Sequence, residues 1–164
     1  MSQSADSCVP PEVVEAFSSA AVTALQELAQ VESLPVSSHQ DQSTTLAEPV
    51  VAATIRLQRM PPGSMSLVLA AKTAANLAAR YLPQGTTLTE EIIDDVACEF
   101  ANVMAGQAKT ILKGSPYHFH LSIPAASRAS SFSQLPKTPP RALSVVLSSE
   151  LGEILLQAHL PLDP

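Results

Sequence analysis

The chain has 164 residues, of which 46% are hydrophobic and 15% are charged, and its formal net charge is −6. A chain of this length can bury most of its apolar surface in one domain, so residues 1–164 are predicted to form a single domain. Because only 9 Lys and Arg are spread along the sequence, it lacks the basic stripe that binding to a nucleic acid requires.

The cysteine count and the N-terminal residues indicate the cellular compartment in which the protein is expected. The two cysteines, Cys8 and Cys98, form neither a disulfide framework nor a CxxC metal motif. The first residues, MSQSADSCVPPE, have no basic region followed by a long apolar run, and no segment approaches the roughly 20 apolar residues needed to cross a bilayer. We therefore expect a cytoplasmic protein that does not enter the membrane.

The first predicted element is a helix that begins at Pro11, a residue type favoured in the first helical turn. Apolar residues follow at spacings of three and four, which is typical of an amphipathic helix, namely at Val14, Phe17, Ala21, Leu25 and Leu28. Residues 35–48 are polar and show no period, so they are predicted to form a flexible surface loop.

A β-hairpin and a short helix are predicted next. Polar and apolar residues alternate in VVAATIRLQRM and again in GSMSLVLAA, and the turn signal Pro61-Pro62-Gly63 separates these two predicted strands. The alanine-rich segment TAANLAARYL then returns to helical spacing and ends at Pro83 and Gly85.

A long helix follows and runs to about Lys113, where Gly114 and Pro116 supply a stop signal. Its N-cap is either Thr87, which forms a capping box with Glu90, or Thr89. The face expected to pack on the sheet carries the large apolar residues Ile93, Val96, Phe100, Val103, Met104 and Ile111.

The last third of the chain is predicted to add one strand and one hairpin. Residues 117–123, YHFHLSI, alternate strictly, residues 124–140 are predicted to form a second flexible loop, and ALSVVLSSELGEILLQAHL forms two strands joined around residues 149–152. Hairpins and helices without long crossovers predict an α+β fold, in which a largely antiparallel sheet packs against about three helices.

The opposite face of the long helix carries a polar ridge. Its residues follow one another at spacings of four, three, four and three, and therefore lie within an arc of roughly 80°. They are Asp95, Glu99, Asn102, Gly106 and Lys109. A solvated helix face would explain the charges, but Asn and Gly each cost a helix roughly 0.5 to 1 kcal/mol relative to Ala. Gly106 leaves a notch for an approaching backbone, and the Asn102 amide offers both a donor and an acceptor to a ligand or a water molecule.

These residues carry a resemblance to a known family. The segment from Glu99 to Lys109, EFANVMAGQAK, is preceded by Asp95 and followed by a strand that ends in LSIP, with Ser122 and Pro124. It resembles the Glu-x-x-Asn helix of the CheX branch of the CheX/CheC/FliY chemotaxis phosphatases, and the resemblance extends over most of the chain. Only one such motif is present, as in CheX-like proteins, whereas CheC-like proteins usually carry two. The helix around Asn76 has Thr73, not Glu, at the position three residues earlier.

The resemblance implies a phosphatase that removes the phosphoryl group from the aspartyl phosphate of a CheY-like response regulator. In this family Asn102 would position the attacking water, and Glu99 would pair with a lysine of the regulator. Asp95, Gly106 and Lys109 are then the expected partner-binding residues. We expect no metal site and no cofactor in this chain, because the divalent ion, Mg²⁺, would belong to the regulator. The family also suggests a homodimer joined through the sheet.

Other interpretations remain open. The same fold can serve as a non-catalytic module that binds a regulator or a chemotaxis or flagellar component. His118 and His120 share one strand face, but no third metal ligand is evident. Cys98 has no histidine at a spacing typical of nucleophilic catalysis.

Overall fold

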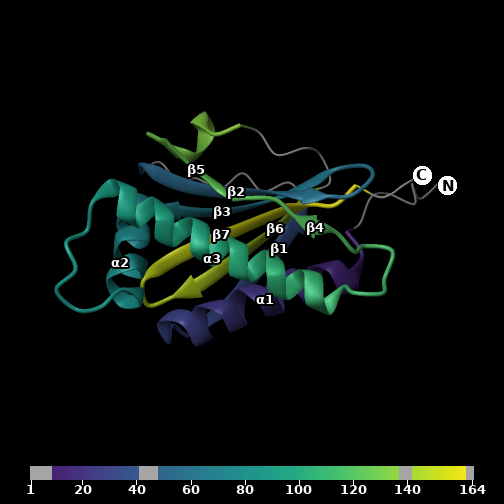
Figure 1. The fold of residues 1–164 in the computed structure, drawn as a ribbon, viewed down its shortest axis with the longest axis horizontal. Helices are drawn as coiled ribbons and strands as arrows, with labels where there is room; N and C mark the ends of the chain where they lie inside the picture. The colour runs from purple at the N-terminus through teal and green to yellow at the C-terminus, as the bar shows by residue number, and fades with distance from the viewer. Residues whose placement is uncertain (1–8, 41–47, 137–141, 162–164) are drawn as a thin grey trace.

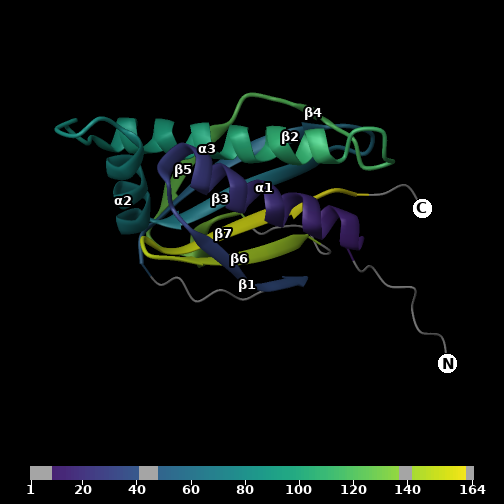
Figure 2. The same ribbon diagram turned by 90° about the horizontal axis from the view of Figure 1, so that it is seen from below.

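The computed structural model describes residues 9–40, 48–136 and 142–161. In these ranges three helices cover one face of a seven-stranded antiparallel sheet, as Figures 1 and 2 show from two directions. The helices are α1 (Pro11–Ala29), α2 (Ala71–Tyr81) and α3 (Glu90–Ile111). The strands are β1 (Ser33–Gln40), β2 (Val50–Gln58), β3 (Gly63–Ala70), β4 (His120–Leu121), β5 (Ala125–Ala129), β6 (Leu143–Ser149) and β7 (Gly152–His159). The predicted α+β architecture is confirmed.

The strand order is β1-β6-β7-β3-β2-β4, and β5 pairs with the same side of β2 as β4. The two predicted hairpins, β2–β3 and β6–β7, are confirmed and lie side by side, because β3 pairs with β7. Gly63 is needed at the start of β3, since a Cβ atom there would lie 2.3 Å from the carbonyl oxygen of His159.

The core lies between the sheet and the three helices. Its aromatic residues link elements that are distant in the sequence: Phe17 of α1 stacks on Phe119, which precedes β4, with ring centroids 6.0 Å apart. Phe100 of α3 meets Tyr81 of α2 edge to face at 5.3 Å. Phe17, Phe100 and Phe119 are fully buried, so this layer fixes where α3 lies on the sheet.

The predicted first helix is confirmed, and its C-cap is the left-handed residue Gln30, with φ 55°. Its buried face is centred differently from the prediction, because small residues fill it. Val14 and Leu28 are only partly buried, whereas the fully buried positions include Ala16, Ala20 and Ala24. Alanines on this face let α1 approach the neighbouring helix α3 closely.

The predicted loop 35–48 is wrong in its described part. Residues Ser33–Gln40 form β1, an edge strand that pairs with β6 through a register shift between Pro35 and Ser37. An edge strand is held by backbone hydrogen bonds on one side, so it needs no alternation of polar and apolar residues. Leu34 and Val36 accordingly remain 72% and 59% exposed. Residues 41–47 lie outside the described ranges.

The predicted loop 124–140 is also wrong in part. Residues Ala125–Ala129 form the short edge strand β5, and Phe132–Gln134 form a 3-10 turn. The sequence AASRA carries neither β-branched nor large apolar residues, so its strand character comes from pairing with β2. Residues 137–140 lie outside the described ranges.

The predicted strand 117–123 is shorter than expected, because only His120 and Leu121 pair with β2. The predicted alternation is seen only at the centre, where Phe119 is buried and His120 is exposed; Tyr117, His118, Leu121 and Ser122 are all half-buried.

Candidate functional site

The helix α3 begins at the second of the two predicted caps. The Thr89 side chain accepts a hydrogen bond from the backbone N–H of Ile92 at 3.2 Å, so Thr87 is not the N-cap. Glu90 and Glu91 lie in the first turn and Lys109 in the last, which matches the direction of the helix dipole. These features stabilise the two ends of a 22-residue helix.

The buried face of α3 is built around alanine more than the predicted stripe suggested. Ile93 and Val103 are only partly buried and Ile111 is 53% exposed, which corrects the expectation that they face the sheet. The buried residues are Val96, Ala97, Phe100, Ala101, Met104, Ala105 and Ala108. This face is shifted around the helix because short side chains allow α3 to lie close to both α1 and the sheet.

The polar ridge (Asp95, Glu99, Asn102, Gly106 and Lys109) lies on the side of α3 opposite these buried residues. Asp95 and Glu99 are exposed, whereas Asn102, Gly106 and Lys109 are half-buried. In the part of the chain that the structure describes, the side chains of Glu99 and Asn102 take part in no hydrogen bond or ion pair. One helical turn separates them, so a carboxylate and an amide project together from the surface and are free to contact a partner.

Charge changes sign along the ridge. Asp95 and Glu99 occupy its N-terminal half, Lys109 lies at its C-terminal end, and the uncharged Asn102 and Gly106 lie between them. A partner that binds across this helix therefore meets negative charge on one side of Asn102 and positive charge on the other, which favours one docking orientation.

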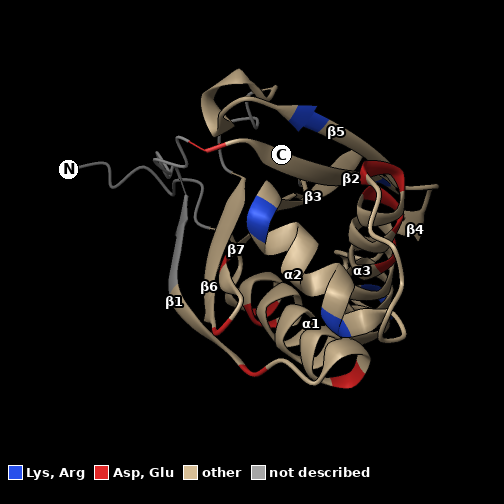
Figure 3. Ribbon diagram, turned by 90° about the vertical axis from the view of Figure 1, so that its left-hand side faces the viewer, with Lys and Arg blue, Asp and Glu red and all other residues tan. Residues whose placement is uncertain are grey.

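The edge of the sheet formed by β4 and β5 borders the ridge. Leu121 lies against Gly106, because its Cδ1 atom would be 3.8 Å from a Cβ atom at that position. Towards the other end of α3, Arg128 of β5 donates from Nε to Oδ1 of Asp94 at 2.9 Å, and its Nη2 forms an ion pair with the same oxygen at 2.8 Å. Nη2 also donates to the carbonyl oxygen of Glu90 at 3.3 Å. Figure 3 shows this basic position of β5 near the acidic first turns of α3. The helix α3 and the sheet edge therefore contact each other at two points, Gly106–Leu121 and Asp94–Arg128.

A bulge interrupts the sheet edge between these two points. Leu57 pairs with Leu121 and Thr54 with Ala125, so three edge residues face two residues of β2. Ser122 bridges the break: its N–H donates to the carbonyl oxygen of Arg56 at 3.1 Å, and its hydroxyl accepts from the Arg56 N–H at 2.9 Å. This explains the Ser-x-Pro sequence. The serine hydroxyl accepts the hydrogen bond that a backbone carbonyl would otherwise accept, and Pro124, which has no N–H to donate, follows where the strand pairing is interrupted.

A shallow groove borders the ridge on its other side, between α3 and α1. The groove is lined by Ala20, Thr23, Glu27, Val103, Gln107 and Ile111, among others. The Gln107 amide donates to the Glu27 carboxylate across it at 3.3 Å. Gln107 is therefore engaged within the chain, in contrast to Asn102 on the ridge.

The other candidate sites offer less chemistry. The rings of His118 and His120 meet edge to face at 5.2 Å, and within the described ranges no three His, Cys, Asp or Glu side chains group together as metal ligands would. Burial, with a smaller contribution from Asp95 and then Asp94, raises the pKa of the Cys98 thiol. A raised pKa leaves less of the reactive thiolate, which argues against a nucleophilic role.

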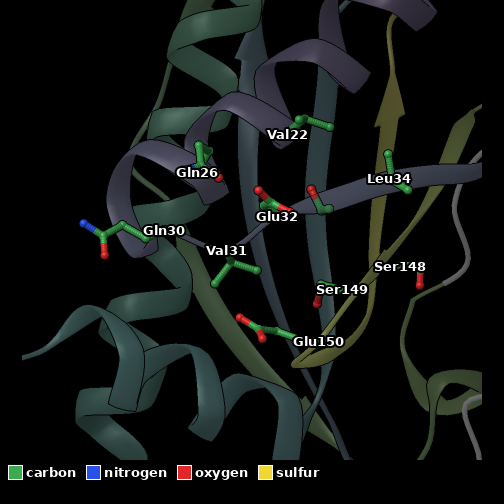
Figure 4. A pocket seen from close by; sticks show the side chains of 10 residues that line it. Val22, Gln26, Gln30, Val31, Glu32, Leu34, Ser148, Ser149 and Glu150 are labelled. Atoms are coloured by element: carbon green, nitrogen blue, oxygen red, sulfur yellow. The ribbon is translucent and has the colours of Figure 1, made fainter.

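A larger hollow of about 720 Å³ lies on a different side of α1, next to the start of β1. Figure 4 shows Glu32 and Glu150 among the side chains around it. Glu150 forms an ion pair with Arg80 of α2, so its carboxylate is already neutralised. The hollow is lined mainly by solvent-facing residues. Its lining contains the carboxylates of Glu32 and Glu150 but no His, Cys or Lys that could work with them in catalysis.

None of the helices in the described ranges combines the length and the apolar character that crossing a bilayer requires.

Comparison with known protein families gives one match. The model of the family described as "Chemotaxis phosphatase CheX" matches residues 51–143, which include α3, the polar ridge and the bulged sheet edge. A comparison with curated proteins gives no match.

Solved structures of chemotaxis proteins have the same fold. A putative chemotaxis protein from Desulfovibrio vulgaris Hildenborough superposes with a TM-score of 0.77 at 21% identity, covering 93% of this chain and 98% of that one. CheX from Vibrio vulnificus gives 0.76 at 22% identity, with coverages of 90% and 98%. CheX in the CheX-CheY-BeF3-Mg²⁺ complex from Borrelia burgdorferi gives 0.65 at 18% identity, with coverages of 90% and 96%.

Proposed function

Since this chain belongs to the CheX family of chemotaxis phosphatases, we propose that it hydrolyses the aspartyl phosphate of a CheY-like response regulator. The observation that carries the proposal is the pair Glu99 and Asn102, projecting from α3 without a partner in the described residues. The related protein from Borrelia burgdorferi, whose structure contains CheY, BeF3 and Mg²⁺, supports this choice of partner.

The chemistry requires little more than placement of a water molecule. An aspartyl phosphate is a mixed anhydride and is already reactive, so its hydrolysis depends on a water held in line with the phosphorus. The carboxamide of Asn102 accepts a hydrogen bond from that water and donates one to a phosphoryl oxygen, which orients the water without a strong base. Its half-buried position on a rigid helix limits the rotamers that it can adopt.

The remaining ridge residues orient the partner. Glu99, one turn before Asn102, pairs with a lysine beside the phosphorylated aspartate and fixes the register of the helix in the regulator's pocket. Gly106 permits close approach of the regulator's backbone, and Asp95 and Lys109 interact with charges at the rim. The divalent cation that offsets the phosphoryl charge belongs to the regulator, and the reaction takes place in the cytoplasm.

The test is the rate of phosphate loss from a labelled regulator with the Asn102→Ala variant. CheY-like regulators from the source cell are phosphorylated with radiolabelled acetyl phosphate, and one that the wild-type protein dephosphorylates is chosen. We expect kcat to fall about 10²-fold, because a misplaced water loses the benefit of orientation.

The matched control is Asn76→Ala, which removes an exposed asparagine from α2 and should leave the rate unchanged. Hydrolysis that persists in Asn102→Ala would reject the assigned mechanism. Binding of the regulator without any hydrolysis by the wild-type protein would instead favour the alternative, a non-catalytic binding module of the same fold.

We also propose that the protein forms a homodimer through the free side of β1. In the described ranges this strand pairs only with β6, and it leaves the apolar side chains of Leu34 and Val36 largely exposed. A second copy of β1 would continue the sheet and cover both. A molar mass in solution equal to that of a monomer, unchanged by Val36→Lys, would refute this pairing.

A further inference from the structure

We propose that Ile123 is an apolar docking contact for the response regulator and sets the affinity of the phosphatase for it. The inference rests on the proposed function and adds to it a residue outside the helix. It is argued from the bulge, the position of Ile123 and its exposure.

The bulge places Ile123 outside the contacts of the sheet. Residues on both sides of it are held, since Ser122 is bonded to Arg56 and Ala125 pairs with Thr54. Ile123 itself is 90% exposed, the largest exposed fraction of any large hydrophobic residue in the described ranges. Bulges commonly redirect a side chain next to a functional site.

The position of Ile123 is next to the polar ridge. The sheet edge touches α3 at Gly106 through Leu121 and at Asp94 through Arg128. Ile123 lies between these two contacts along the edge, and Glu99 and Asn102 lie between them along the helix. A regulator whose phosphorylated pocket receives Asn102 therefore covers this part of the sheet edge as well.

An exposed isoleucine next to the polar ridge can supply the apolar contact area that the ridge lacks. Burying an aliphatic side chain against a partner is favourable, whereas the ridge itself offers the partner only polar and charged groups. The ridge supplies orientation and Ile123 supplies apolar area beside it. The occupant is the regulator, because the same body must reach Asn102.

The experiment compares Ile123→Ser with Met60→Ser, which removes another strongly exposed side chain, 83% accessible, from the β2–β3 turn. The readouts are KM and kcat for the phosphorylated regulator and Kd for the regulator activated with beryllofluoride and Mg²⁺. We expect Ile123→Ser to raise KM and Kd about tenfold with kcat unchanged, as the loss of a buried aliphatic contact implies. Ile123→Leu should restore most of the affinity, and Met60→Ser should behave as wild type.

Two results would overturn the inference: unchanged KM and Kd in Ile123→Ser, or an effect confined to kcat. An equal rise in Met60→Ser would also count against it, because the effect would then not depend on place. These results are separable from failure of the proposed function, which would appear as a wild-type protein that does not dephosphorylate the regulator. Because Ile123 contacts little of its own chain, urea unfolding of Ile123→Ser should match wild type.

Discussion

The two faces of α3 use the same helix for opposite purposes. The buried face carries Phe100, Met104 and a series of alanines, all fully buried or nearly so. The outward face carries Asn102 and Gly106, two residue types that weaken a helix, at positions where its own packing does not require them.

The difference indicates how stability and activity are divided in this domain. Small residues on the buried face bring α3 close to α1 and the sheet, and Phe100 fixes its position by packing against Tyr81. This rigid support allows the outward face to carry unfavourable residues, which we propose serve a partner. Substitutions on the two faces should therefore separate the two properties.

The largest expected effect is on the buried face. Phe100→Ala should lower the free energy of unfolding by about 3–5 kcal/mol, because it removes a fully buried ring from the core. Asn102→Ala should leave stability unchanged or raise it by roughly 0.5 kcal/mol, because Ala is the better helix former. Urea unfolding monitored by circular dichroism measures both. Similar losses of unfolding free energy in the two variants would show that Asn102 supports the fold. The two faces of α3 would then not divide stability from binding.

The second effect concerns Gly106 and should have opposite signs for stability and binding. The Cβ atom in Gly106→Ala would lie 3.8 Å from Cδ1 of Leu121, which is an ordinary contact, so the chain itself does not require glycine here. We expect the free energy of unfolding to rise by about 1 kcal/mol, because Ala replaces Gly within a helix. KM for the phosphorylated regulator should rise, since the added methyl group occupies the space proposed for the partner. A stabilised variant with unchanged KM would exclude Gly106 from the docking surface.

The sequence predicted the outward face better than the sheet edge that borders it. The ridge follows from helical spacing alone, because residues 95–109 lie within one regular element. The helices and the two hairpins were likewise predictable, since their patterns repeat locally. The sequence did not show the shift of the buried face towards alanine, because closeness to α1 decides which side of α3 is covered.

The edge strands could not be predicted from local patterns. β1 contains Pro35 and serines, and β5 consists of small and charged residues, so each is defined by the strand beside it. The exposure of Ile123 depends on a register shift against β2, which is a long-range property. The Ser-x-Pro sequence was the one local sign of it, and its physical reason is visible only with Arg56 in place.

A smaller effect should come from Glu99, and it should depend on salt. Glu99→Ala removes a proposed ion pair with the regulator. Salt screens exposed charges, and the distance over which their attraction persists falls from about 10 Å at 0.1 M salt to about 3 Å at 1 M. KM of the variant should exceed that of wild type at low ionic strength and approach it at high ionic strength. Glu153→Ala, which removes an exposed carboxylate from β7, serves as the control. A rise in KM that ignores ionic strength would exclude the ion pair.

The smallest effect should appear at Cys98, which lies on the border between the two faces. It is half-exposed, and burial followed by Asp95 and Asp94 raises the pKa of its thiol. In a Cys8→Ser background, alkylation by iodoacetamide near neutral pH should therefore be slower than that of a free cysteine, because less thiolate is present. Asp95→Asn should speed alkylation only slightly, since burial is the larger cause, whereas unfolding in urea should speed it strongly.

The same thiol reports on docking without any change to the ridge. Cys98 lies one helical turn before Asn102, on a neighbouring part of the α3 surface. A regulator that receives Asn102 would therefore cover the exposed side of Cys98. Saturating amounts of the regulator activated with beryllofluoride and Mg²⁺ should slow alkylation further, and the inactive regulator should slow it less. If saturation leaves the rate unchanged, the partner binds elsewhere, and the outward face of α3 loses the role that explains its asparagine and glycine.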